Sequence, residues 1–236
     1  MKTNIQSSMS PLRKTSLLAG AIYLLTFVSI PTLALYNPLR GSGPEGSGNG
    51  VIIGALLEII VGLAGIGTAI VLFPVLKKQN ETLALGLVAA RILEAATIFV
   101  GVAFIVTAVT LQQGGSDRSL VSALVLMYDK IFLVGQSLMP ALDDLLLGIL
   151  LYRSGLVPKF LAWIGIVGAF VLVAGDIGVF SGMLEQRAPL TALFAIPVAV
   201  FEFSLGLLLV FKGFRTSGRT QANTETAEDA ERRKEY

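Results

Sequence analysis

Six long apolar stretches fill most of this 236-residue chain. A helix needs roughly 20 apolar residues to cross the hydrocarbon core of a bilayer. Segments near 16–36, 51–76, 82–111, 128–152, 158–180 and 189–212 each supply that length. Strands in their place would leave backbone N–H and C=O groups unpaired in lipid. The sequence therefore predicts an all-α, polytopic transmembrane helix bundle with six spans, covering residues 16–214.

The composition agrees with a chain whose immediate partner is the lipid bilayer. Hydrophobic residues make up 54% of the sequence and charged residues 14%, with a mean hydropathy of +0.76, whereas a soluble domain carries about 25% charged residues. The formal net charge of +2 is too small to indicate a nucleic-acid partner. Cysteine and histidine are both absent, which removes the usual zinc, copper, haem and iron–sulfur ligands. We therefore expect no metal and no cofactor.

Lysine and arginine are distributed unevenly over the two sides of the expected bundle. With the N-terminus inside, most of the 18 basic residues fall on the inner side, namely Lys2, Arg13, Lys14, Lys77, Lys78, Arg153, Lys159, Lys212, Arg215, Arg219, Arg232, Arg233 and Lys234. The outer side has Arg40, Arg118, Lys130 and Arg187, and Arg91 lies within the membrane. The positive-inside rule then predicts a multi-pass protein of the plasma (inner) membrane with the N-terminus and the C-terminus in the cytoplasm.

The two ends and the connectors complete this layout. Residues 1–15 are expected to form a cytoplasmic N-terminal segment. The run from Leu17 to Leu35 exceeds the roughly 7–15 apolar residues of a signal peptide, so it is a retained span. Residues 215–236 are polar and mixed in charge, which predicts a disordered cytoplasmic tail. Outer connectors are expected at Pro38–Gly50, a flexible glycine-rich linker, and at Gln112–Met127 and Ser181–Ala188.

Six acidic residues lie inside these apolar segments with Arg91 as the base among them, namely Glu58, Glu94, Asp143, Asp144, Asp176 and Glu202. A charge in hydrocarbon costs at least a few kcal/mol, so such residues usually face a bundle interior or a wet cavity. Depth counted at the helical rise decides which of them can meet. Arg91, Glu94, Asp143, Asp144 and Glu202 fall in one midplane layer and form the candidate polar site. Glu58 and Asp176 are more peripheral, toward the outer side.

Arg91 and Glu94 are three residues apart, so they lie on one helix face and can pair. Pairing lowers the cost of both charges in hydrocarbon. One interpretation is that the pair only holds the bundle together. The other is that Arg91 neutralises an anionic substrate or a mobile carboxylate.

Asp143 and Asp144 are adjacent and therefore point about 100° apart on a helix. Asp143 continues a stripe with Gln136, and Asp144 one with Ser137. Two like charges this close in a low dielectric leave at least one carboxyl protonated near neutral pH, and a protonatable carboxyl can serve in a proton relay. The alternative is that one aspartate caps a broken helix or bonds to a neighbour. Pro140 is expected to kink this helix.

Several stretches together resemble a known family. They are Arg13–Gly20, Gly54–Glu58, Gly65–Ala69, Leu72–Glu81, Ala89–Glu94 and Leu150–Pro158. Over about residues 11–214 the chain resembles the bacterial membrane family called domain of unknown function 4386. The resemblance implies an integral membrane protein with a six-helix layout, and no established activity, substrate or cofactor. Glu58, Arg91 and Glu94 lie inside the matching stretches, and the Asp143–Asp144 pair does not belong to the family pattern.

Three functions remain open from the sequence. The leading interpretation is a non-enzymatic membrane protein that transports or senses a small solute or protons. It predicts a polar cavity that joins at least three of Arg91, Glu94, Glu202 and Glu58. The second is a structural or accessory subunit whose buried charges only stabilise the bundle. The third, which the sequence favours least, is an intramembrane enzyme acting on lipid through paired carboxylates.

Overall fold

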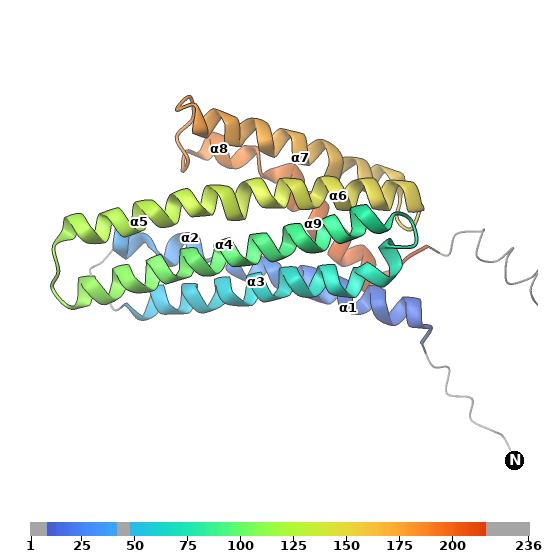
Figure 1. Cartoon of the computed structure of the whole chain (residues 1–236), viewed down its shortest axis with the longest axis horizontal. Helices are drawn as coiled ribbons and strands as arrows, with labels where there is room; N and C mark the ends of the chain where they lie inside the picture. Colours follow the sequence, from blue (N-terminus) through green and yellow to red (C-terminus); the bar gives the residue numbers. More distant parts are fainter. Residues whose placement is uncertain (1–8, 42–47, 216–236) are drawn as a thin grey trace, which may run out of the picture.

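The structure is a computed structural model that describes residues 9–41 and 48–215 of the chain. The described residues form helices and connecting turns and contain no strand (Figure 1). Residues 42–47 of the glycine-rich linker, the first eight residues and the tail from residue 216 lie outside the described residues. The prediction of an all-α architecture is confirmed.

The helices follow one another along the chain with three short irregular turns between them. They are α1 (Pro11–Thr26), η1 (Phe27–Ser29), α2 (Thr32–Leu35), η2 (Asn37–Arg40), α3 (Asn49–Leu76), α4 (Glu81–Gln113), α5 (Arg118–Leu133), η3 (Val134–Leu138), α6 (Met139–Ser154), α7 (Lys159–Phe180), α8 (Pro189–Leu193) and α9 (Ile196–Phe211). Five stretches of the described chain are long and apolar enough to cross a membrane, namely Asn49–Leu76, Glu81–Gln113, Arg118–Ser154, Lys159–Phe180 and Pro189–Phe211. The chain is thus a multi-pass helical membrane protein by length and composition.

The first apolar stretch is not the single continuous helix that the sequence suggested. Helix α1 ends at Thr26, five residues before Pro31, and proline has no N–H to continue a helical ladder. Three hydroxyls follow the broken stretch and donate to carbonyls three residues back: Thr26 to Tyr23 at 2.7 Å, Ser29 to Thr26 at 3.2 Å and Thr32 to Ser29 at 2.7 Å. These side chains provide donors where the helix is interrupted.

The prediction of a long outer connector over Gln112–Met127 is wrong. The turn between α4 and α5 is short, and α5 already begins at Arg118. Asp117 is its N-cap, and its side chain accepts from the N–H of Ser119 at 3.0 Å. An acidic N-cap before an apolar run is a helix-start signal, so most of the residues assigned to a loop belong to the membrane helix.

The stretch Arg118–Ser154 is one helical rod with a π-helical turn, η3, in its middle. Pro140 is the second residue after this turn, and a π-turn nearby can accommodate its missing N–H. The wider turn changes the direction in which later side chains point. Gln136 and Ser137 line the cavity described below, whereas Asp143 and Asp144 are not among its lining residues.

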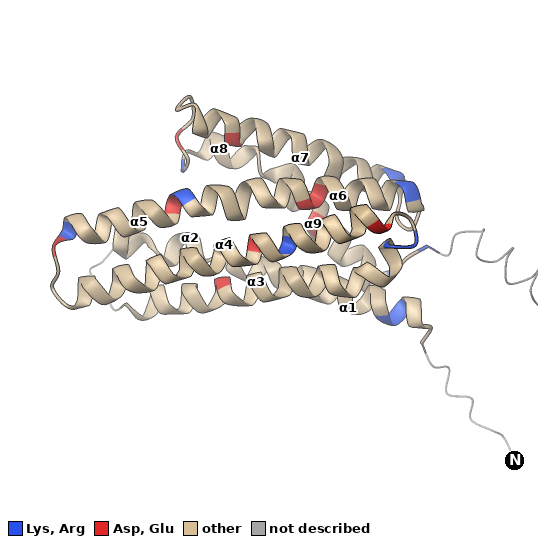
Figure 2. Cartoon of the chain, in the orientation of Figure 1, with Lys and Arg blue, Asp and Glu red and all other residues tan. Residues whose placement is uncertain are grey.

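One end of the bundle carries the basic connectors, and we call it the basic end. Figure 2 shows lysine and arginine gathered where α1 begins, where α3 meets α4 and where α6 meets α7. Arg13 donates to the carbonyls of Leu209 at 2.8 Å and Val210 at 2.5 Å, which joins the start of α1 to the end of α9. The N–H of Arg215 donates to Leu156 at 2.8 Å. Both described chain ends therefore lie at the basic end, and we call the other end the far end.

The buried face of α4 passes through successive layers along the bundle. Ala84 and Leu87 belong to a large apolar core near the basic end. Arg91 and Glu94 follow as a buried charged layer. Beyond it, Ile98 and then Ile105 belong to apolar clusters toward the far end. The charged layer is therefore enclosed between two apolar ones.

Candidate functional site

Arg91 is the centre of the buried charged layer and pairs with three acidic residues from three helices. Its Nη1 lies 2.9 Å from Oε2 of Glu94 on the same helix, α4. Its Nη2 lies 2.9 Å from Oε1 of Glu202 on α9, and its Nε lies 3.4 Å from Oδ2 of Asp143 on α6. The planar guanidinium can serve three partners because its donors point in different directions. We call these four residues the Arg91 cluster.

Neighbouring small and aromatic residues shape the space around this arginine. Nη2 of Arg91 also donates to the hydroxyl of Tyr23 on α1 at 3.2 Å. The guanidinium carbon lies 5.7 Å from the centre of the Tyr23 ring. Gly65 of α3 faces the pair, because a Cβ there would stand 3.5 Å from Oε2 of Glu94 and 3.7 Å from Cδ of Arg91. Four membrane helices and α1 thus converge on one arginine.

Asp143 and Asp144 are both fully buried. Neither Asp144 carboxyl oxygen has a hydrogen-bond partner within the described residues, and Asp144 interacts electrostatically with Glu202 and Arg91. The two aspartates point in different directions as helix geometry requires, and only Asp143 makes an ion pair with Arg91. One guanidinium therefore faces four acidic side chains, including Asp144.

Glu58 lies apart from the Arg91 cluster. Its Oε1 accepts from the hydroxyl of Tyr128 at 2.5 Å, and its Oε2 has no hydrogen-bond partner among the described residues. Tyr36 stacks edge-to-face on Tyr128 with ring centres 5.3 Å apart. The guanidinium carbon of Arg40 lies over the Tyr128 ring, 5.8 Å from its centre. Tyr128 thus donates a short hydrogen bond to Glu58, and Gln136 and Arg40 also interact with this carboxyl.

Asp176 of α7 is also separate from the cluster. It is 4% exposed, and its Oδ1 accepts from the hydroxyl of Ser137 in η3 at 2.6 Å. Its Oδ2 has no hydrogen-bond partner in the described part of the chain. The π-turn brings Ser137 to this position, which an unbroken helix from α5 to α6 would change.

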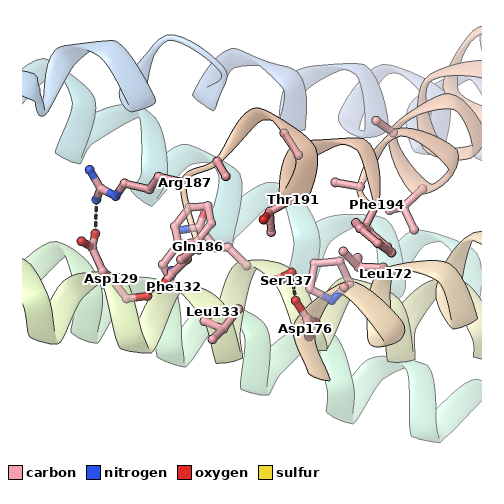
Figure 3. Close-up of a pocket in the computed structure, with 18 of the residues that line it drawn as sticks. Asp129, Phe132, Leu133, Ser137, Leu172, Asp176, Gln186, Arg187, Thr191 and Phe194 are labelled. Atoms are coloured by element: carbon pink, nitrogen blue, oxygen red, sulfur yellow. Dashed lines mark hydrogen bonds and ion pairs between the residues drawn. The ribbon is translucent and has the colours of Figure 1, made fainter. Parts of the chain in front are cut away.

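A cavity of about 570 Å³ lies between α5, η3, α7 and the α8–α9 segment (Figure 3). It begins at Arg40, Asp129, Gln186 and Arg187 near the far end and reaches Glu202. Asp129 pairs with both arginines, at 2.9 Å with Arg40 and through a very short contact with Arg187, while Gln186 donates to the Asp129 carbonyl at 2.6 Å. The connector from α7 to α8 is therefore tied to α5 at the cavity rim.

Glu202 is the residue through which the cavity touches the Arg91 cluster. Its side chain is 15% exposed, whereas that of Arg91 is 4% exposed and that of Asp143 is fully buried. Tyr128 lines the cavity too and gives it a second connection, to Glu58. The sequence predicts a cavity that joins at least three of Arg91, Glu94, Glu202 and Glu58, and this cavity does not do so. Of those four, only Glu202 lines it, because the packed helices cover the others.

The Arg91 cluster is closed toward the basic end. Side chains one or two turns along the same helices are fully buried leucines, among them Leu87, Leu147 and Leu205. They belong to the large apolar core that also contains Leu76 and Leu209. The cluster is therefore reached by a cavity from the far-end side and separated from the basic end by a packed apolar layer.

Sequence reasoning missed Asp129, which holds both rim arginines. With a span that begins near residue 128, Asp129 falls at the expected membrane edge, where a charged residue attracts no notice. The structure places it eleven residues after the helix start at Arg118. The signal that could have located it is the N-cap at Asp117 followed by an apolar helix.

The fold and the buried charges define a multi-pass helical membrane protein with a polar core site. The family model described as "Domain of unknown function (DUF4386)" matches residues 18–213. The chain belongs to this family, and the resemblance seen in the sequence is confirmed. No curated protein and no solved structure gives a significant match.

Proposed function

We propose that this protein transports a small solute, a proton or both across the plasma membrane, with Glu202 as the link between an entry cavity and a buried charge network. The observation that carries the proposal is that Glu202 belongs to both the cavity and the Arg91 cluster. It lines the 570 Å³ cavity and also lies 2.9 Å from Arg91. A change in the charge or occupancy of the cavity would therefore act directly on the buried ion pairs.

The asymmetry of access supports transport. A transporter exposes its site to one side at a time, with packed residues closing the other side. Here the cavity leads from the far end to Glu202, and the leucine-rich core closes the path from Glu202 to the basic end. In this proposal the structure corresponds to a state that is open toward the far end.

The balance of charge supports a role for protons. Among the residues that the structure describes, Arg91 is the one base in contact with Glu94, Asp143 and Glu202, and Asp144 lies beside them. Four carboxyls around a single guanidinium are a surplus of acid over base, and carboxyls inside a membrane bundle are a common component of proton relays. Exchange of protons with the cavity would pass through Glu202, the exposed member of the group.

We propose six spans, with both termini in the cytoplasm. The stretch from α1 to α2 runs the length of the bundle beside α3 despite its break (Figure 1). The basic end, which holds Arg13, Lys78, Arg153 and Lys212, would be the cytoplasmic end by the positive-inside rule. The far end and the cavity mouth would then face outward.

The absence of cysteine from the chain makes this topology testable with single-cysteine variants. Lys14→Cys and Lys78→Cys lie at the basic end and Glu185→Cys at the far end, all at exposed positions. With a membrane-impermeant maleimide on intact cells, we expect labelling of Glu185→Cys alone. Permeabilised cells should label all three. If Lys14→Cys is labelled from outside while Lys78→Cys stays protected, the first stretch does not cross and the chain has five spans.

Proton flux into proteoliposomes tests the transport proposal. The wild-type chain should dissipate a pH gradient faster than empty liposomes, and Glu202→Gln and Glu94→Gln should remove most of that difference. Glu185→Gln is the matched control, because Glu185 is an exposed acid that does not line the cavity. Equal fluxes for wild type, Glu94→Gln and Glu202→Gln would contradict proton transport through this cluster.

A structural or accessory role is the second candidate, and the dense partnering of Arg91 favours it. A nearly buried arginine with three acidic partners from three helices is also a way to hold helices in register. In that case Glu202→Gln would lower thermal stability while wild-type and variant liposomes would both leak protons at the rate of empty ones. The pairing of flux with thermal stability therefore separates the two functions.

A further inference from the structure

The inner part of the cavity is acidic, while its basic side chains are engaged at the rim. Arg40 and Arg187 both pair with Asp129. Figure 3 shows the Asp129–Arg187 pair and the Ser137–Asp176 pair well apart along the cavity. The charged side chains that line the cavity beyond the rim are Asp176 and Glu202.

Asp176 has an unused acceptor. The residue is 4% exposed and lines the cavity, yet Oδ2 has no donor within the described residues, while Oδ1 accepts from Ser137. A buried carboxyl oxygen without a donor is costly. A ligand that carries an N–H donor into the cavity would satisfy it.

Glu202 adds a second acidic group to the lining of the same cavity. Its partner Arg91 is shared with Glu94 and Asp143. A single positive charge divided among three carboxyls neutralises none of them fully. The floor of the cavity therefore has a surplus of acidic groups, which disfavours an anion and favours a cation.

The rest of the lining suits an apolar body. Phe27, Phe132 and Phe194 contribute aromatic rings, and Leu172 and Val198 contribute aliphatic surface. Aromatic faces attract cations as well as apolar groups. The volume of about 570 Å³ lies within the roughly 300–1,000 Å³ that small-molecule sites usually have.

We propose that the cavity binds a small organic cation, an ammonium group on an apolar, aromatic-sized body. The ammonium N–H donates to Oδ2 of Asp176, its charge faces Glu202, and the body packs against Phe132, Leu172 and Phe194. This inference rests on the proposed function, since it names the class of solute that the entry cavity accepts.

Three naphthyl probes of one shape test the ligand class. They are 2-(1-naphthyl)ethylammonium, 3-(1-naphthyl)propionate and 2-(1-naphthyl)ethanol, which are cationic, anionic and neutral. Binding to the full chain in nanodiscs of zwitterionic lipid is measured by equilibrium dialysis, with empty nanodiscs subtracted to remove partitioning. We expect the cation to bind with an affinity at least about tenfold above the other two, because a hydrogen bond to a charged group is worth that much.

Variants then locate the site. Asp176→Asn keeps an acceptor for Ser137 and removes the charge. It should therefore lower the affinity for the cation by about tenfold or more and leave the affinity for the neutral probe unchanged. Asp117→Asn, at the exposed N-cap of α5, is the matched control and should bind the cation as wild type does. Ala199→Phe, which fills the cavity from a lining position, should remove binding of the cation and gives a second test if Asp176→Asn folds poorly.

The outcomes decide the inference separately from the proposed function. Equal or tighter binding of the anion or the neutral probe, no binding of the cation, or unchanged cation affinity in both Asp176→Asn and Ala199→Phe would overturn it. None of those results bears on proton flux through Glu202. Selective cation binding without any flux in proteoliposomes would instead support the ligand class and contradict transport.

Discussion

Glu202 pairs with Arg91 across 111 positions of sequence, with Oε1 2.9 Å from Nη2, while its side chain remains 15% exposed to the cavity. The other acidic partners of Arg91 are more deeply buried. One side chain of α9 thus belongs both to the packed interior and to the space that leads toward the far end. This relationship makes charge changes at Arg91 and Glu202 the most direct probes of the bundle.

Removal of Arg91 should destabilise the bundle strongly. Arg91→Gln leaves Glu94, Asp143 and Glu202 without their base, and removing one partner of a buried ion pair costs about 3–5 kcal/mol. Thermal unfolding in detergent should show a markedly lower midpoint. Arg153→Gln, at an exposed position of the basic end, is the control and should unfold near the wild-type temperature. Equal midpoints for both variants would show that the cluster carries little stability.

The two stacked tyrosines at Glu58 should respond differently to loss of their hydroxyls. Tyr128→Phe removes the hydroxyl that donates to Glu58 and should cost about 1–3 kcal/mol, because a buried carboxyl loses a hydrogen bond. Tyr36→Phe removes a hydroxyl that has no hydrogen-bond partner in the described structure, so it should be neutral or slightly stabilising. Denaturant or thermal unfolding of the two variants side by side checks this. A loss for Tyr36→Phe as large as for Tyr128→Phe would mean that the hydrogen bond to Glu58 does not account for the cost.

Gly20 should be intolerant of a side chain. A Cβ there would stand 2.7 Å from the carbonyl oxygen of Gly206 on α9, and relief of that clash requires α1 and α9 to separate. Gly20→Ala should therefore cost about 1–3 kcal/mol. Gly86→Ala is the matched control, because within 4 Å its Cβ would meet only Leu146, at 3.7 Å, among the described residues, and alanine favours the helix by up to about 1 kcal/mol. The contact is refuted if Gly20→Ala raises the unfolding temperature as Gly86→Ala does.

Arg13 should anchor the start of α1 to the end of α9. Its guanidinium donates to the carbonyls of Leu209 and Val210, which a helix C-terminus leaves without intrahelical partners. Arg13→Ala should lower stability by about 1–2 kcal/mol. Lys14→Ala changes an exposed neighbour of the same charge and should have a much smaller effect. Limited proteolysis near residue 212 should also become faster in Arg13→Ala alone.

Much of the helical layout could be predicted from the sequence. Five of the expected spans appear as membrane-length helices with ends near the expected ones, the main exception being α5, which begins at Arg118. Apolar length and the helical rise are local properties, so they can be counted along the chain. The first stretch departed from the expectation because Pro31 affects hydrogen bonding that a hydropathy average does not register.

The sequence by itself determined which side chains are ionisable inside apolar helices, and the i,i+3 spacing that allows Arg91 to meet Glu94. Only the tertiary structure decided that Glu202 and Asp143 reach the same guanidinium, that Ser137 bonds to Asp176, and that Asp129 holds the rim. Depth along a helix follows from counting residues, whereas the direction of a side chain depends on the π-turn at η3 and on how helices cross. A cavity is likewise the space that packing leaves between helices, and no single segment encodes it.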